Sequence, residues 1–497
     1  MFFIKSKNNA LQNNLFPAPT FLLNLSELAS FRNVKNIPVG KEQLLISRET
    51  GGWCYLTEQE YFFYQLLNRV PIQNIIEKLG FARQDCLDLI HILCQRGLIS
   101  FPGIESNGEL IRPEVIERSF RLTFMFRSSC NLACRYCYLG GEKLARGHYL
   151  GDDQARAAIR LALSQDNRKI MVDFGEYNLA WESIKSLVNY VEYEAHQHRD
   201  KEIIFQVQTN GTGLTASKTQ YLREHEFFVG ISLDGPQEIH NRFRVDRQGR
   251  GSYQRVVAGL NRILNARIPY IVLTTITQGN WDKAQAVLAH FKSLGIQAYA
   301  FKPIIRRGLA IQEWDRIGMG SKEYQQFVRD EFNYAIDQKN ADLLDETAVK
   351  FIFRALGDPR GWHNHCPTGY CTREKEVLFI NPDGYVYPCP RFASNGDNPL
   401  SLFHILDGSD LVQLNGVSTA VYSAPPSCTD CLWKSYCMGG CVLSHFSGDD
   451  SCSGYQEIYQ SIFGIFFPAI RAEKIGYSSK LGRLTVFEKN FFKPRNL

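Results

Sequence analysis

The sequence predicts an α/β protein with a parallel sheet at its centre, a helical region before it and a cysteine-rich region after it. Two observations carry this prediction. Apolar strand-like runs alternate with amphipathic helical patterns through the middle of the chain, which is typical of a parallel sheet covered by helices. The 14 cysteines are also unevenly spread, because three lie in one short loop and eight more lie between residues 366 and 452.

The central region, residues 113–330, is expected to contain six strands that alternate with helices. In parallel βα units the chemistry lies on loops that follow the carboxyl ends of the strands. Site residues are therefore expected just after each strand. The strand-like runs cover residues 121–126, 169–174, 203–209, 228–233, 271–277 and 298–303, and helical patterns include residues 153–164, 181–196 and 281–294.

The first region, residues 1–112, is expected to fold as a separate unit with its own core. Residues 43–47 have the pattern of a strand. Thr57 and Glu60 form the sequence signature of a capping box, which opens the first of three short helices. Gly80 is expected to end the second helix. The three cysteines of this region lie in apolar settings and are expected to be core residues.

Composition excludes several classes of protein. The chain has 497 residues and a formal net charge of +5, which does not argue for nucleic acid as a partner. No apolar run approaches the roughly 20 residues of a membrane span, and no signal peptide is recognisable. Clustered cysteines suit metal binding in a reducing compartment better than disulfides. We therefore expect a soluble cytoplasmic protein without a membrane or nucleic-acid partner.

The loop after the first central strand carries Cys130, Cys134 and Cys137 at C-x3-C-x2-C spacing. Thiolates at this spacing can surround an iron–sulfur cluster or a zinc ion. A structural zinc site requires a fourth ligand, and the next cysteine is Cys366. Three ligands would leave one iron of a [4Fe–4S] cluster open to an outside ligand. A zinc knuckle or a set of buried thiols is the alternative.

This loop, with Tyr136 before its third cysteine, closely resembles the radical S-adenosylmethionine (SAM) superfamily. The resemblance implies an open partial (β/α)6 TIM-type barrel, a cluster on the three cysteines, and SAM bound to its open iron. Phe174 and Tyr177 depart from the family's Gly-Gly-Glu-Pro loop. His240 is expected to be structural rather than a base. The residues that match SAM-contacting motifs are Tyr136, Gly175, Glu176, Thr209, Asn210, Ser232 and Arg244.

The C-terminal cysteines, with a hairpin signal at residues 377–387, resemble the SPASM domain, which is expected over residues 331–460. The resemblance implies two auxiliary [4Fe–4S] clusters and so three clusters in all, although two zinc sites are the alternative. The first auxiliary cluster would be held by Cys366, Cys371, Cys389 and Cys441. The second would be held by Cys428, Cys431, Cys437 and Cys452.

Residues 1–112 resemble a winged-helix, PqqD-like element that grips the leader of a precursor peptide, although a packing domain or a DNA-binding winged helix has a similar pattern. Residues 461–497 are expected to form a tail that packs back as a helix. Sulfatase-maturing relatives carry a basic Asp after the hairpin cysteine, whereas Pro390 follows Cys389 here. This departure argues against sulfatase maturation.

Together these features predict an enzyme that modifies a ribosomally made precursor peptide, with an electron donor such as flavodoxin or ferredoxin. A side-chain cross-link (a thioether or cyclophane) is the leading hypothesis, and epimerisation or backbone excision would begin in the same way. Action on a protein side chain or small metabolite, or a non-catalytic iron–sulfur module, are the other hypotheses. The sequence assigns no catalytic acid or base.

Overall fold

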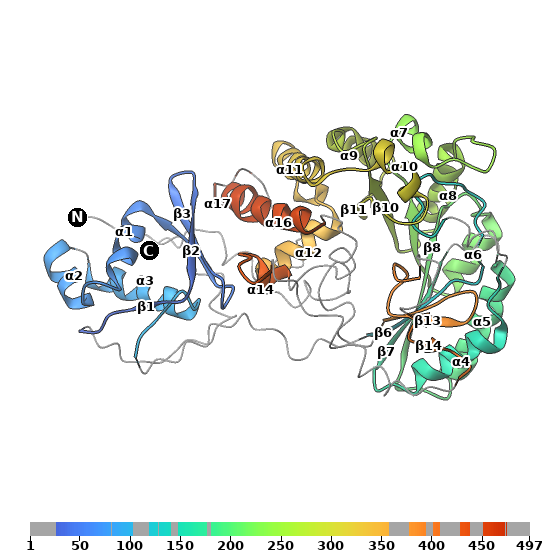
Figure 1. Ribbon diagram of the computed structural model, residues 1–497, viewed down its shortest axis with the longest axis horizontal. Helices are drawn as coiled ribbons and strands as arrows, with labels where there is room; N and C mark the ends of the chain where they lie inside the picture. Colours follow the sequence, from blue (N-terminus) through green and yellow to red (C-terminus); the bar gives the residue numbers. More distant parts are fainter. Residues whose placement is uncertain are drawn as a thin grey trace.

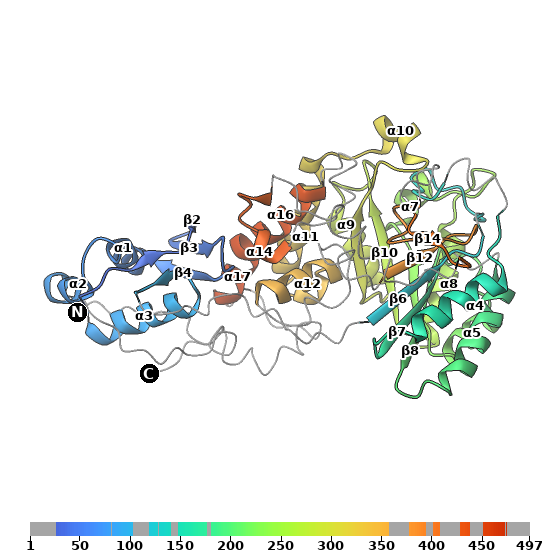
Figure 2. The same ribbon diagram turned by 60° about the horizontal axis from the view of Figure 1, so that its bottom comes forward.

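The computed structural model describes residues 26–80, 82–102, 119–127, 129–140, 148–175, 180–356, 377–393, 401–407, 428–437, 451–472 and 474. Figure 1 shows three parts in a row, which are a small N-terminal domain, a layer of helices and a larger domain built on a sheet. Figure 2 shows the same order after a turn of the molecule. Among the described residues, no helix combines the length and the apolar character needed to cross a membrane.

The large domain contains a nine-stranded sheet with the order β11-β10-β9-β8-β7-β6-β12-β13-β14. Its first six strands are parallel and follow the chain order, which confirms the expected α/β fold with a mostly parallel sheet. β11 and β14 are its two edges, so the described strands do not close into a ring. The six parallel strands are β6 (Ser119–Phe124), β7 (Lys169–Phe174), β8 (Glu202–Thr209), β9 (Phe228–Ser232), β10 (Tyr270–Ile276) and β11 (Tyr299–Pro303).

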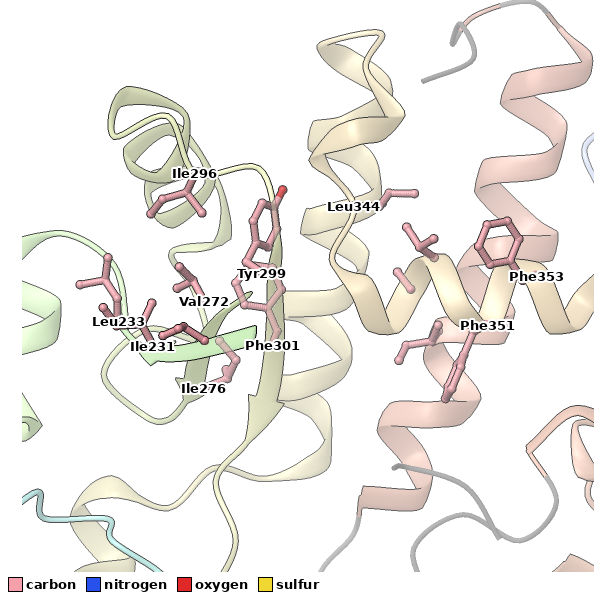
Figure 3. Packing of buried hydrophobic residues seen from close by; sticks show 14 of the residues in the cluster. Ile231, Leu233, Val272, Ile276, Ile296, Tyr299, Phe301, Leu344, Phe351 and Phe353 are labelled. Atoms are coloured by element: carbon pink, nitrogen blue, oxygen red, sulfur yellow. The ribbon is translucent and has the colours of Figure 1, made fainter. Parts of the chain in front are cut away.

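One face of this sheet packs against helices and the other face is more open. Successive side chains of a strand point to opposite faces. Ile170 and Val172 of β7 belong to the main core, whereas Met171 between them is only half-buried. Figure 3 shows the buried face around β9, β10 and β11. The helices in this domain are α4 (Asp152–Leu163), α5 (Trp181–Ala195), α6 (Ala216–Glu224), α7 (Gln237–Phe243), α8 (Tyr253–Asn265), α9 (Ala284–Ser293) and α10 (Ala310–Ile317).

The predicted hairpin forms and joins the same sheet. It consists of β12 (Val377–Ile380) and β13 (Tyr385–Tyr387), and β14 (Phe403–His404) adds to its outer edge. Gly384 in the turn has a φ of 82°, a conformation that suits glycine. β12 runs parallel to β6, so the C-terminal region extends the central sheet beside the cysteine loop.

The N-terminal domain has a three-stranded antiparallel sheet with the order β2-β3-β4, a short β1–β5 pair and three helices. Thr57 and Glu60 form the predicted capping box, and Gly80 ends the second helix in the left-handed conformation. The strand pattern at residues 43–47 is confirmed, while β2 and β4 were not foreseen. The elements are β1 (Ser30–Phe31), β2 (Val34–Val39), β3 (Glu42–Ser47), β4 (Trp53–Thr57), α1 (Glu58–Leu66), α2 (Ile72–Leu79), α3 (Arg83–Gln95) and β5 (Ile99–Ser100).

A helical layer lies between the two domains (Figure 1). α16 continues through the π-helical η6 into α17, so one helical run crosses residue 461 without a break. α11 packs along α16, and α12 contacts both α14 and α16. The layer consists of α11 (Ser321–Asp337), η2 (Ala341–Leu343), α12 (Glu346–Ala355), α14 (Lys434–Cys437), α16 (Ser451–Ser461), η6 (Ile462–Phe466) and α17 (Phe467–Arg471).

The N-terminal sheet docks on this layer through one of its two faces. Its other face covers the domain's own helices. Trp53 is 2% exposed, stacks on Phe467 with ring centroids 5.3 Å apart, and donates from Nε1 to the Ala355 carbonyl at 2.8 Å. Arg471 binds Glu42 through two nitrogens at 2.7 and 2.9 Å. The N-terminal domain is therefore packed firmly against the C-terminal helices.

Candidate functional site

The cysteine loop lies at the carboxyl edge of the sheet, directly after β6. Two backbone hydrogen bonds fix it to the segment that follows α7. The Ala133 nitrogen donates to the Val245 carbonyl at 2.8 Å, and the Arg135 nitrogen donates to the Phe243 carbonyl at 3.0 Å. The chain that follows β9 therefore holds the cysteine loop in place, although β9 lies three strands away from β6 in the sheet.

The segment after β11 closes on the other end of this loop. The Leu309 nitrogen donates to the Cys137 carbonyl at 3.0 Å. A Cβ on Gly308 would lie 2.5 Å from the carbonyl oxygens of both Cys137 and Tyr138, and the φ of Gly308 is 55°. Glycine is therefore required here for the two segments to approach so closely.

The three cysteines of the loop are half-buried as residues, and their thiols influence one another. Burial raises the pKa of Cys134 to about 12; Cys137 and Cys130 add to the rise, and Arg244 opposes it. The thiolate is the form that binds metal, so binding of a cluster would release protons. Within the described residues, no three side chains of His, Cys, Asp or Glu converge on the point that a single metal ion would occupy.

Amide side chains connect the cysteine loop to the loop after β8. Asn210 Nδ2 donates to Asn131 Oδ1 at 2.8 Å and lies 3.6 Å from Cys130 Sγ. Asn131 Nδ2 in turn donates to Thr212 Oγ1 at 2.8 Å. The predicted SAM contact Asn210 therefore lies beside the first cysteine of the loop.

A buried network braces the loop from the side of β9. Arg244 Nε donates to Asp234 Oδ2 at 2.9 Å, and the Tyr136 hydroxyl donates to the same oxygen. The Asp234 nitrogen donates to His240 Nδ1 at 3.3 Å, and Ser252 donates from Oγ to the Arg244 carbonyl at 2.8 Å. Burial lowers the pKa of His240 to about 4, which fits the structural role expected for it. Two predicted SAM contacts, Tyr136 and Arg244, thus share a partner inside the chain.

The remaining predicted SAM contacts are distributed over three strands. Gly175 follows β7 and donates a backbone hydrogen bond to the last residue of β6 at 2.9 Å. Thr209 ends β8 and is 1% exposed. Ser232 ends β9, and its Oγ accepts from Gln208 Nε2 at 3.4 Å. Glu176 lies outside the described residues.

Asp173 is a site residue that the sequence analysis did not single out. It is the next-to-last residue of β7, is 8% exposed, and faces away from the core that contains Phe174. Thr123 donates to its Oδ2 at 3.2 Å, whereas Oδ1 is buried and has no hydrogen-bond partner among the described residues. Burial raises the pKa of Asp173 to about 6, and Arg121 opposes the rise. The sequence signal that could have identified Asp173 is an acidic residue near the carboxyl end of a strand that is otherwise mostly apolar.

Cys389 lies near the same edge of the sheet. It follows β13 and packs on a small cluster that includes Phe379 and Met125. Burial raises the pKa of Tyr138, and Cys389 is the largest of the charges that add to the rise, which also include Cys137 and Asp173. Tyr138 therefore lies close to Cys137, to Cys389 and to the Asp173 carboxylate.

Four further cysteines come together in the helical layer. Gln456 Nε2 lies 3.7 Å from Cys452 Sγ and 3.9 Å from Cys431 Sγ. Burial raises the pKa of Cys437 to about 12, and Cys452, Cys431 and Cys428 all add to the rise. These four are the residues expected to hold the second auxiliary cluster. Of the first auxiliary set, Cys389 is described, and the other three members, Cys366, Cys371 and Cys441, lie outside the described residues.

Comparisons with known proteins find one matching family model and several distant relatives. The model for the radical SAM superfamily matches residues 126–290. The cysteine-type anaerobic sulfatase-maturating enzyme of Clostridium novyi is 23% identical over 328 residues, which cover 63% of this chain and 85% of that enzyme. The serine-type enzyme of Bacteroides thetaiotaomicron is 24% identical over 366 residues, with coverages of 67% and 86%.

A solved structure has a similar fold. The native sulfatase-maturating enzyme anSMEcpe, with bound AdoMet and the Kp18Cys peptide, is 22% identical and gives a TM-score of 0.59. The similarity covers 70% of this chain and 97% of that one. It shows that the two chains share their fold.

Proposed function

We propose that this protein, a radical SAM enzyme related at low identity to anaerobic sulfatase-maturating enzymes, modifies a ribosomally made precursor peptide. The observation that carries the proposal is the cysteine loop at the carboxyl edge of the sheet. Cys130 Sγ lies 3.6 Å from Asn210 Nδ2, and predicted SAM contacts lie at the ends of β8 and β9 and directly after β7. The peptide bound in the anSMEcpe structure supports a peptide as the substrate class.

The superfamily implies SAM and a [4Fe–4S] cluster, and the residues present fit both. Cys130, Cys134 and Cys137 would hold the cluster, because they are three thiols in one constrained loop. The four cysteines around Cys437, and a set that includes Cys389, would hold two auxiliary clusters. When bound, SAM and the first cluster supply a radical that removes hydrogen from a C–H bond, and auxiliary clusters would accept the electron released as a product bond forms.

The chain's own part is to position SAM and exclude water. Asn131 and Asn210 fix the loop at the end of β8, so the cofactor would meet a preorganised surface. Asp234 holds Tyr136 and Arg244 in one buried network. These contacts support the assignment of both residues to the SAM-binding side of a partial TIM-type barrel.

Asp173 is the group we assign to proton uptake. A cross-link that forms between a carbon radical and a second side chain releases one proton and one electron. Pro390 occupies the place where sulfatase-maturing relatives carry their base. Asp173 Oδ1 has no hydrogen-bond partner among the described residues, and the carboxylate lies near Tyr138, which in turn lies near Cys389. A pKa of about 6 suits a carboxylate that accepts a proton near neutral pH.

The N-terminal domain would bind the leader of the precursor by strand addition. β2 is an edge of its sheet and is half exposed along its length, and no other described strand pairs with its outer edge. A peptide can add to such an edge through backbone hydrogen bonds. The contact of the same sheet with the helical layer would hold the leader at a fixed place relative to the site.

Co-expression with a short peptide encoded beside the gene tests the proposal, with mass spectrometry of the peptide as the readout. Loss of two hydrogens indicates cross-linking, unchanged mass with altered stereochemistry indicates epimerisation, and loss of a fragment indicates excision. The same peptide without its leader should remain unmodified. A protein that cleaves no SAM under strong reductant would instead support the non-catalytic iron–sulfur module.

A further inference from the structure

Five arginines lie on the cysteine loop or on segments that pack beside it. The set, which we name the arginine patch, consists of Arg135, Arg242, Arg247, Arg306 and Arg316. Arg316 has a side chain that is 73% exposed, and Arg135 one that is 40% exposed. Arg242, Arg247 and Arg306 are also exposed. These residues come from three separate segments, namely the loop itself, α7 with its following turn, and α10 with the connection that precedes it.

Side-chain contacts connect these arginines to the cysteine loop, α7 and α10. Arg247 Nη2 donates to the Cys130 carbonyl at 2.9 Å, so it touches the loop directly. Arg135 and Arg316 both lie 3.8 Å from the same oxygen of Glu313. The Arg242 guanidinium carbon lies 5.3 Å from the centre of the neighbouring Phe243 ring.

A shared apolar base supports the patch. Tyr136, Phe243, Ala310 and Ile317 form one buried cluster under α7 and α10. Trp314 packs against this cluster, and the Arg306 guanidinium carbon lies 5.9 Å from the centre of its ring. The two helices are therefore fixed relative to the cysteine loop, so the backbone positions of Arg242 and Arg316 are fixed as well.

The charge of the patch is strongly positive. The patch contains five arginines, and α10, which carries Arg316, contains two carboxylates, Glu313 and Asp315, so these seven residues have an excess of three positive charges. The chain as a whole has a net charge of only +5 over 497 residues. Such a concentrated charge raises the association rate of an acidic partner by roughly 10 to 1,000-fold at low salt.

We propose that the arginine patch is the docking surface for a small acidic one-electron carrier, which rests on the function proposed above. The carrier loses one electron to the group held by Cys130, Cys134 and Cys137, and no atom or proton is transferred. The position favours an electron carrier among acidic partners, because Arg247 contacts the Cys130 carbonyl and Arg135 lies within the cysteine loop itself. Docking there places the carrier as close as the protein surface allows. A small, wet and weak interface is typical of such redox encounters.

The test compares two electron sources for the same fully loaded enzyme. Anaerobic cleavage of SAM to 5′-deoxyadenosine is measured with a reduced acidic flavodoxin and, separately, with dithionite. The variant is the double charge reversal Arg242→Glu with Arg316→Glu. The control, Arg199→Glu with Arg262→Glu, makes the same change in net charge at exposed positions away from the patch. We expect the patch variant to lose tenfold or more in the flavodoxin-dependent rate at low salt, while the control and all dithionite rates stay within twofold.

Equal flavodoxin rates in the two variants would overturn the proposal, as would an equal loss with dithionite, because that loss would report damage to the loop. Binding of the flavodoxin, followed by fluorescence at low and high salt, is independent of SAM cleavage. Failure of the wild-type protein to cleave SAM with dithionite would contradict the proposed function, and salt-sensitive flavodoxin binding at the patch would still be expected. A DNA duplex that displaces flavodoxin from the patch would assign the surface to nucleic acid instead.

Discussion

Replacement of Asp173 by asparagine should change the pH dependence of stability. Asp173 is 8% exposed, and burial raises its pKa from 3.8 to about 6. A carboxyl group whose pKa is higher in the folded state stabilises the fold below its unfolded pKa, and this contribution is lost as the pH rises through 6. At neutral pH the ionised group should therefore destabilise the fold by about 3 kcal/mol.

The quantity to measure is the change in unfolding free energy with pH, because any pH-independent effect of the new amide cancels in the difference between two pH values. Between pH 4.5 and pH 7, Asp173→Asn should gain about 2 kcal/mol in the free energy of unfolding relative to wild type. Urea unfolding of anaerobically purified protein at both pH values measures it. Asp153→Asn, an exposed carboxylate on α4, is the matched control and should show no such change.

A difference between wild type and Asp173→Asn that stays constant from pH 4.5 to 7 would refute the reasoning. It would mean that the Asp173 carboxylate is solvated and that burial does not raise its pKa toward the value that suits proton uptake. If the pH effect is present, the same variant should cleave SAM normally and fail to complete the cross-link. Asp173→Glu should restore part of the product.

Through His240, the wild-type protein should lose about 2 kcal/mol of unfolding free energy between pH 7 and pH 5, because burial lowers the pKa of His240 to about 4 and its contribution to stability is lost as the pH falls below 6.5. His240→Asn should remove this loss, and a variant with the same pH dependence of urea unfolding as wild type would contradict the prediction. Trp53→Ala should cost about 3–5 kcal/mol in unfolding free energy, because Trp53 is 2% exposed between two domains. Phe62→Ala, at a side chain 50% exposed, should cost far less, and equal costs would contradict the described interface. Cys437→Ala should lower the iron content by about four atoms per chain, and elemental analysis with full iron retention would exclude a cluster at that site.

Local sequence signals predicted the strands well. Residues 169–174 match β7 at both ends, and the other five parallel strands begin or end within two residues of their expected bounds. Runs of alternating apolar residues set these limits because each strand buries one face. The Thr57 capping box and the hairpin turn at Gly384 were also predictable, since both depend on residues that lie close together in the chain.

Pairings between distant segments could not be predicted in this way. Nothing in residues 377–380 shows that β12 would pair with β6, because any strand edge offers the same backbone groups. The hydrogen-bond partner of Arg244 could not be predicted for a different reason. Its sequence motif marks it as a cofactor contact, but the partner that its Nε meets is Asp234, ten residues earlier and buried with it.

The site itself was partly predictable. Spacing identified the cysteine loop, whereas the resemblance to the SPASM domain supplied the set of four cysteines that come together around Cys437. Asp173 was missed, since an acid in a strand is informative only when its surroundings are known. The arginine patch was missed for a related reason, because its members are spread from Arg135 to Arg316 and gather only in the fold.

Anaerobic reductive cleavage of SAM tests the central claim most directly. Reconstituted wild-type protein with dithionite should release 5′-deoxyadenosine and methionine in equal amounts, and it should bind iron at the loop. The variant with Cys130, Cys134 and Cys137 all replaced by alanine should release neither. Product formation that survives this triple replacement, or a wild-type protein that holds zinc at these cysteines and leaves SAM intact, would contradict the account.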